Sequence, residues 1–286
     1  MKRITENSVQ EEQFRKFLFS LFKTYKECRK NMNVPLDEDS FQETLENIDI
    51  TFWECDDEKT TGTFNVTPTT FNVIRENFEK NGKERNLFLL QHEFTHLSSP
   101  LNKEIFGSRE SMRAMLAEYK QMLEGKNNDV ISEYDVLRGA IAVDEVLAQW
   151  CCEESNDFLK HKTRERKTIT QNIMGEYITV QTDFSDNDIY SPLQQYVENL
   201  ANNLGYEDLR SFASSILTEK KRLNDLISPE TVEQLGYIGI LCEGIYQDNG
   251  FQDFGLPASD IPIAITRLDR IRKQSTFSDG PDVGSM

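Results

Sequence analysis

Apolar side chains recur at three- and four-residue steps along several stretches of this chain, a spacing that predicts amphipathic helices. The first stretch covers residues 11–32, where Phe, Leu and Tyr alternate with Lys and Glu. Further stretches cover residues 108–124 and 132–157 and, nearer the C-terminus, residues 192–204, 206–227, 229–246 and 257–273. The chain is therefore predicted to be mainly helical.

Two regions break this helical pattern and read as strands. Residues 47–55 (NIDITFWEC) alternate and are rich in β-branched and aromatic side chains, and residues 61–67 repeat this character before Pro68 ends the run. Residues 71–74 fit either a third strand or the start of a short helix. Residues 168–172 and 176–183 predict a hairpin around Met174–Gly175. Together with the helices, these strands predict an α+β fold.

The charge balance narrows the choice of partners. The chain of 286 residues has 49 Asp and Glu against 32 Lys and Arg, a formal net charge of −17. A field of this sign repels phosphate backbones, so we expect no nucleic-acid partner. The same field attracts divalent cations and basic peptides.

The chain carries no sign of export or membrane insertion. The N-terminus MKRITEN has no apolar stretch after its basic pair, and no window approaches the ~18 apolar residues that span a bilayer. Five cysteines, two of them adjacent, do not suit a disulfide framework. We therefore expect a cytoplasmic protein in a reducing compartment, with export by a route that uses no N-terminal signal as the open alternative.

The most informative stretch is LFLLQHEFTHL at residues 87–97, a predicted helix that contains the pattern His-Glu-x-x-His. Side chains four residues apart share one helix face, so His92 and His96 can bind a single ion. Glu93 then lies where a carboxylate reaches a water at that ion. Two buried helix histidines can also be ordinary core residues. The chain has only three His, however, and two of them fall in this motif, which favours a metal site.

A third protein ligand is required for a catalytic zinc, and Glu145 is the best candidate. The predicted helix around it is apolar over most of its circumference, so Glu145 lies within a surface that should be buried. A buried carboxylate without a cationic partner is costly, and a divalent cation removes that cost. The alternatives are a salt bridge to Arg138 or Arg113, a helix register that exposes Glu145, or His161 as the third ligand.

The motif followed by a downstream helical Glu resembles the gluzincin branch of the zincin metallopeptidases, with its thermolysin-like ligand set. This resemblance implies one Zn²⁺ per chain on His92, His96 and Glu145. It also implies Glu93 as the general base that activates a zinc-held water to cut a peptide or protein substrate. In fold, it implies a small twisted sheet packed on the motif helix, with residues 61–67 as the edge strand that takes substrate in extended form.

The resemblance covers about residues 47–157 and suggests four parts of the chain. These are an N-terminal helical segment (1–46), a zincin-like catalytic core (47–160), a mainly helical C-terminal lobe with a hairpin (161–277) and a disordered tail (278–286). The chain also departs from the family pattern. Gln149 stands where many gluzincins carry an Asp that binds a ligand His. Asp144 could serve instead, although it points about 100° away round the helix. The longer metzincin motif is absent.

The residue that stabilises the oxyanion is left open among His161, Tyr177, Tyr190 and Tyr196. Two alternative functions also remain: a zincin scaffold that binds a partner without catalysis, and a protease toxin or regulator of narrow specificity. The intact Glu93 argues against the first, because a structural metal site needs no general base. The sequence leaves the oligomeric state undetermined.

Overall fold

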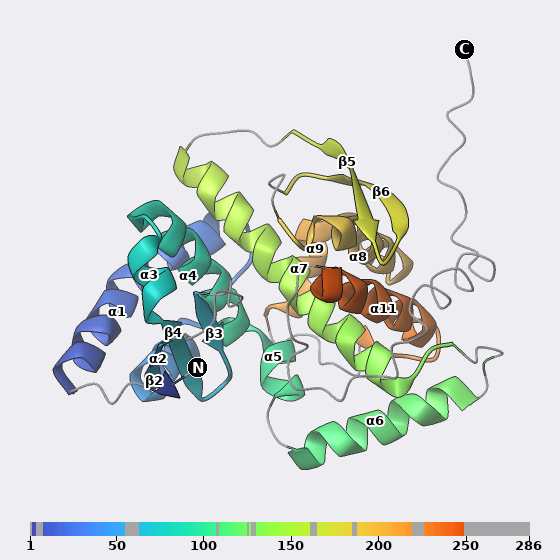
Figure 1. Cartoon of the computed structure of the whole chain (residues 1–286), viewed down its shortest axis with the longest axis horizontal. Coiled ribbons are helices and arrows are strands. Elements are labelled where there is room, and N and C mark those ends of the chain that lie inside the picture. Colours follow the sequence, from blue (N-terminus) through green and yellow to red (C-terminus); the bar gives the residue numbers. More distant parts are fainter. Residues whose placement is uncertain are drawn as a thin grey trace.

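The computed structural model describes residues 2–3, 8–54, 63–106, 109–124, 126, 130–160, 165–184, 188–218 and 226–248. Within these ranges the fold is mixed α+β, with long helices and two small sheets (Figure 1). His161, the predicted helix at 257–273 and the predicted tail at 278–286 lie outside the described residues. No helix in the described ranges is long and apolar enough to span a bilayer.

The first sheet has the strand order β1-β2-β4-β3, formed by Lys2–Arg3, Asp49–Glu54, Thr70–Ile74 and Phe64–Val66. Strands β2 and β4 run parallel, whereas β3 runs antiparallel to β4 and forms one edge. The described part of the predicted strand at 61–67 is thus an edge strand. Residues 71–74 lie in β4, which passes directly into the short helix α3 (Arg75–Lys80).

One hydrophobic core lies between this sheet and three helices. These helices are α1 (Ser8–Asn31), α2 (Glu38–Asn47) and α4 (Lys83–Ser98). The alternation in β2 and β4 sends Ile50, Phe71 and Val73 into this core, where aromatic rings from the helices meet them. The N-terminal helix therefore packs with the sheet and the motif helix.

A second core surrounds α7 (Glu133–Lys160), which crosses the molecule between the two groups of elements (Figure 1). The predicted hairpin is confirmed, and its strands pair with Met174 and Gly175 at positive φ in the turn. The other elements of this half are α5 (Pro100–Ile105), α6 (Arg109–Glu124), β5 (Lys167–Ile173), β6 (Glu176–Thr182), α8 (Ser191–Asn203), α9 (Leu209–Ile216) and α11 (Val232–Asp248).

Helix α9 is shorter than the helix predicted at 206–227, and that prediction is wrong at its start. Asp208 accepts a hydrogen bond from the backbone N–H of Ser211, and the Ser211 hydroxyl closes a capping box. This reciprocal cap starts the helix at Leu209. The predicted division of the chain into four parts remains a prediction.

Helices α7 and α11 approach each other closely because glycines face the contact. A Cβ at Gly139 would stand 2.0 Å from the carbonyl oxygen of Leu235, and one at Gly239 would stand 1.9 Å from that of Asp135. The same interface buries Arg138, whose Nε lies 2.8 Å from Glu243 and whose Nη1 lies 3.3 Å from Asp135. The position of α7, and of every side chain on it, is therefore tightly constrained.

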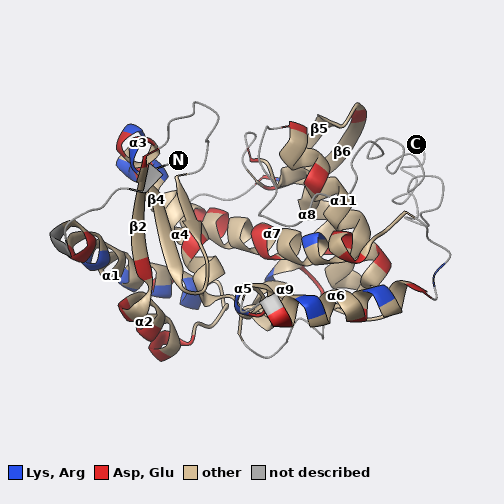
Figure 2. Ribbon diagram, turned by 60° about the horizontal axis from the view of Figure 1, so that its bottom comes forward, with Lys and Arg blue, Asp and Glu red and all other residues tan. Residues whose placement is uncertain are grey.

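Figure 2 shows charged residues along most of the helices, and α2 carries four acidic residues and no basic one. Seven charged side chains within the described ranges are buried: Arg29, Asp135, Arg138, Asp144, Glu145, Glu153 and Glu243. Five of the seven belong to α7. Because each buried charge must be compensated, the surroundings of α7 are where chemistry is expected.

Candidate metal centre

His92, His96 and Glu145 come together at the junction of the two cores. The two histidines lie one turn apart on α4, and Glu145 faces them from α7. The Nε2 atoms of the two rings are 3.0 Å apart, and Oε2 of Glu145 lies 3.1 Å from Nε2 of His92 and 3.3 Å from Nε2 of His96. All three side chains are buried. The structure thus brings together the three ligands that the sequence predicts.

The shape and chemistry of this triad fit a zinc ion. With Zn–N and Zn–O bonds of about 2.0–2.1 Å, the ligand atoms of a tetrahedral site stand about 3.3 Å from one another. The three donor atoms form a nearly equilateral triangle with edges of 3.0–3.3 Å. Two imidazoles and one carboxylate are also a donor set found in catalytic zinc sites, which leave the fourth position to water or substrate.

Packing explains why the two helices hold their ligands in place. Helix α4 buries Leu90, Phe94 and Leu97 in the first core, so its opposite face is turned towards α7. Helix α7 is buried along most of its length, as its apolar circumference predicts. The Cys152 thiol also donates to the carbonyl oxygen of Phe88, which joins the two helices one turn before His92 on α4 and two turns after Glu145 on α7.

Asp144 holds the outer side of the His96 ring. Its Oδ2 lies 2.6 Å from Nδ1 of His96, and its Oδ1 accepts a hydrogen bond from the Ser99 hydroxyl. A proton on Nδ1 leaves the Nε2 lone pair directed at the triad, which is the tautomer that a metal ligand needs. Gln149, at the position where the family pattern has Asp, donates instead to Glu153 at 2.9 Å. Asp144 therefore makes the contact to a candidate ligand His that many gluzincins make with an Asp at the position of Gln149.

The electrostatics of the site favour a positive charge. Burial disfavours the protonated His96 ring, but the Glu145 and Asp144 carboxylates outweigh it and hold the pKa of His96 well above its usual value. Burial likewise disfavours ionised Glu145, but His96 and His92 hold its pKa well below the usual value. A metal cation can replace the proton that the triad otherwise attracts.

The structure does not support a salt bridge from Glu145 to either arginine. Arg138 is engaged by Asp135 and Glu243 in the interface with α11. Arg113 is exposed on α6. Within the described ranges, the Glu145 carboxylate lies 3.1 Å from Nε2 of His92 and 3.3 Å from Nε2 of His96.

Glu93 lies beside the triad and is available for proton transfer. It follows His92 on α4 and is partly buried, and its carboxylate makes no hydrogen bond within the described part of the chain. Burial raises the pKa of Glu93, against the opposing effect of His92 and His96. A carboxylate with a raised pKa and free lone pairs suits a general base.

Of the three candidates for oxyanion stabilisation that lie in the described residues, Tyr190 is the one placed at the triad. Its ring stacks on His92 with 6.0 Å between centroids and an interplanar angle of 15°. Burial and the Glu145 carboxylate raise the pKa of Tyr190 well above its usual value, so its hydroxyl stays protonated and donates. Tyr177 is 73% exposed on the hairpin, and Tyr196 packs on the second core from α8.

Sequence reasoning could not rank these tyrosines, and it missed two residues that support Tyr190. Asp188 accepts a hydrogen bond from the Tyr190 backbone N–H at 2.8 Å, and Tyr246 places its hydroxyl 3.5 Å from that of Tyr190. The run Asp188-x-Tyr190-Ser191-Pro192 is a signal for the first contact, because an Asp just before a helix-starting Pro commonly bonds a backbone N–H two residues on. Nothing in the sequence signals the contact with α11.

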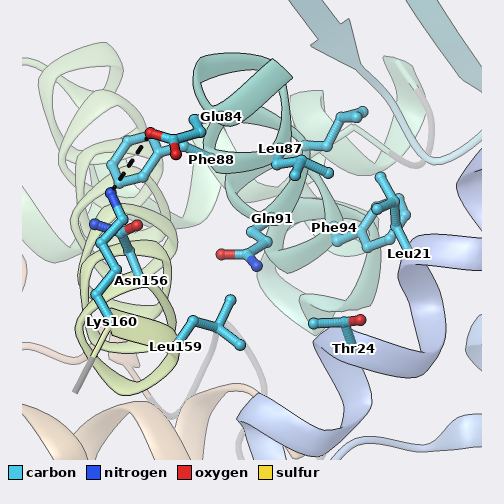
Figure 3. A pocket seen from close by; sticks show the side chains of 11 residues that line it. Leu21, Thr24, Glu84, Leu87, Phe88, Gln91, Phe94, Asn156, Leu159 and Lys160 are labelled. Atoms are coloured by element: carbon cyan, nitrogen blue, oxygen red, sulfur yellow. Dashed lines mark ion pairs between the residues drawn. The ribbon is translucent and has the colours of Figure 1, made fainter. Parts of the chain in front are cut away.

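A groove of about 190 Å³ lies beside α4, outside the triad (Figure 3). Gln91 of α4 points into it, with α1 and the end of α7 as its other walls. Its lining residues are Leu21, Thr24, Glu84, Leu87, Phe88, Leu90, Gln91, Phe94, Asn156, Leu159 and Lys160. None of the three candidate ligands belongs to this lining, so the groove is separate from the metal centre.

Comparisons of this chain with protein-family models, with curated proteins and with solved structures find no match. The resemblance to zincins therefore rests on the residues and the geometry of the site.

Proposed function

We propose that this protein is a zinc-dependent metallopeptidase of the zincin type, with one zinc ion held by His92, His96 and Glu145. The observation that carries the proposal is the convergence of these three buried donors, from two helices, beside a carboxylate with no hydrogen-bond partner in the described part of the chain. A purely structural metal site would have no use for Glu93.

In the proposed reaction, zinc would act as a Lewis acid and lower the pKa of the water bound to it. Glu93 accepts a proton from the water whose oxygen bonds to the scissile carbonyl carbon. It then passes that proton to the leaving amine as the C–N bond breaks. Asp144 keeps the His96 ring in one tautomer throughout, because its carboxylate accepts the Nδ1 proton.

The first sheet supports a peptide substrate for the proposed enzyme. Strand β3 (Phe64–Val66) is the edge of that sheet, pairs antiparallel with β4 and lies against α4, the helix with the motif. An extended peptide can add to such an edge through main-chain hydrogen bonds. This route places the peptide backbone next to the helix that carries Glu93.

The test compares Glu93→Gln with Glu84→Gln, a matched change on the exposed face of the same helix. Zinc content is measured on the purified variants, and cleavage of a random-sequence peptide library is read by mass spectrometry. We expect all three proteins to hold one zinc per chain. We expect Glu93→Gln to lose turnover by about 10²–10⁴-fold, the usual contribution of a general base, and Glu84→Gln to cut like the wild type.

Two results would contradict the proposal. Retained turnover in Glu93→Gln would remove Glu93 as the base. A zinc-loaded wild type that leaves both the whole library and folded proteins uncut would point to a binding scaffold.

A further inference from the structure

Tyr190 contacts two of the three candidate ligands from the C-terminal half of the chain. Its ring lies nearly parallel to the ring of His92, and its hydroxyl interacts electrostatically with the Glu145 carboxylate. The same hydroxyl lies 3.5 Å from the hydroxyl of Tyr246 on α11. One side chain thus links α4, α7 and α11 at the metal centre.

The backbone holds this tyrosine in a fixed place. Its N–H donates to Asp188 at 2.8 Å, and its carbonyl oxygen accepts from the N–H of Leu193 at 2.9 Å in the first turn of α8. Pro192 at the start of that helix restricts the chain further. Tyr190 therefore has little conformational freedom left to lose when a metal ion binds to the neighbouring ligands.

These contacts restrict side-chain rotations that His92 and Glu145 must give up when they bind a metal ion. A stacked ring limits rotation of the His92 imidazole about its side-chain bonds. The Tyr190 hydroxyl is a polar neighbour of the Glu145 carboxylate and favours the direction in which that carboxylate faces Nε2 of His92 and Nε2 of His96. Outer partners of this kind commonly determine how tightly a metal is held.

We propose that Tyr190 is a positioning residue of the metal centre, which holds His92 and Glu145 in their binding geometry and thereby sets the affinity for zinc. This inference rests on the proposed zinc site. It differs from a role in oxyanion stabilisation, because the side chain acts on the metal ligands and not on the substrate.

The experiment measures zinc affinity by competition with a chromophoric chelator on the full-length protein. Tyr190→Phe keeps the stacked ring and removes the hydroxyl, and Tyr190→Leu removes both. Tyr206→Phe is the matched control, because it loses a hydroxyl bonded to Ser215 at 2.9 Å in the same half of the chain. The visible spectrum of the cobalt-substituted proteins reports the ligand geometry independently of activity.

We expect Tyr190→Phe to weaken zinc binding by about 10–100-fold, the usual cost of losing an outer partner. Tyr190→Leu should bind more weakly still, and Tyr206→Phe should bind like the wild type. The cobalt spectrum should change in both Tyr190 variants. Urea unfolding of the zinc-free proteins identifies any variant that fails to fold.

Wild-type zinc affinity and an unaltered cobalt spectrum in Tyr190→Phe would overturn the inference, even if Tyr190→Leu fails to fold. Lost turnover at saturating zinc with unaltered affinity would also overturn it, and would assign Tyr190 to the substrate instead. A wild type that binds zinc without cutting peptides would overturn the proposed peptidase and leave this inference standing.

Discussion

Nδ1 of His96 lies 2.6 Å from Oδ2 of Asp144, while Nε2 of the same ring lies 3.3 Å from Oε2 of Glu145. Two consecutive residues of α7 therefore hold opposite sides of one imidazole. Their directions differ by about 100° round the helix, and the ring lies in the space between them. The ligand and its supporting carboxylate thus come from a single turn.

The first prediction concerns this supporting carboxylate. Asp144→Asn keeps an oxygen that can accept from Nδ1 but removes the negative charge that makes the ring more basic. We expect zinc affinity to fall by about 10–100-fold, measured by chelator competition. Gln149→Leu should leave the affinity unaltered, because Gln149 bonds to Glu153 and not to a ligand. If Gln149→Leu weakened zinc binding more than Asp144→Asn, the residue at position 149 and not Asp144 would support the ligand His, as in the gluzincin pattern.

The second prediction concerns the third ligand. Glu145→Gln removes the anionic donor from the triad, so zinc affinity should fall by more than the roughly 100-fold typical of outer partners. Glu154→Gln is the control, because it lies on the same helix and pairs with Arg210 away from the site. Elemental analysis after dialysis should find zinc in the control and not in Glu145→Gln. Equal zinc in both would place the third ligand elsewhere, with His161 the next residue to test.

The third prediction concerns the close approach of α7 and α11. Gly139→Ala places a methyl group 2.0 Å from the Leu235 carbonyl oxygen, which neither backbone can accept without moving. We expect the free energy of unfolding to fall by about 3 kcal/mol, at the upper end of over-packing costs. Gly82→Ala meets nothing within 4 Å and should stay within about 1 kcal/mol of the wild type. Urea denaturation of both variants checks this, and similar stabilities would mean that the helices separate easily.

The fourth prediction concerns pH. Burial raises the pKa of Asp188 from 3.8 to about 7. The folded state therefore keeps the proton that the unfolded state releases, so stability should fall as pH rises from about 4 to about 7. The loss should be up to about 4 kcal/mol. Asp188→Asn keeps the acceptor for the Tyr190 N–H and should not show this loss. Urea denaturation of zinc-free protein at about pH 4 and about pH 8 measures it; parallel pH profiles for both proteins would contradict it.

Much of the secondary structure was predictable because local spacing determines it. The helix expected at 11–32 is α1 (Ser8–Asn31), and the hairpin around Met174 and Gly175 pairs as expected. The helix expected to begin at residue 206 begins instead at Leu209, because a short-range cap at Asp208 outweighs the apolar periodicity there. The sequence did not predict the parallel pairing of β2 with β4. Residues far apart in the chain make this pairing, and its register depends on how both strands pack on the shared core.

The sequence by itself determined the candidate ligands of this protein. The helical repeat places His92 and His96 on one face, and the apolar surroundings of Glu145 mark it as a carboxylate that needs a cation. Only the tertiary structure decided that Asp144 supports His96 and that Tyr190 covers His92 and Glu145. Neighbours on one helix follow from a fixed geometry, whereas contacts between helices depend on how α4, α7 and α8 pack, which no local pattern encodes.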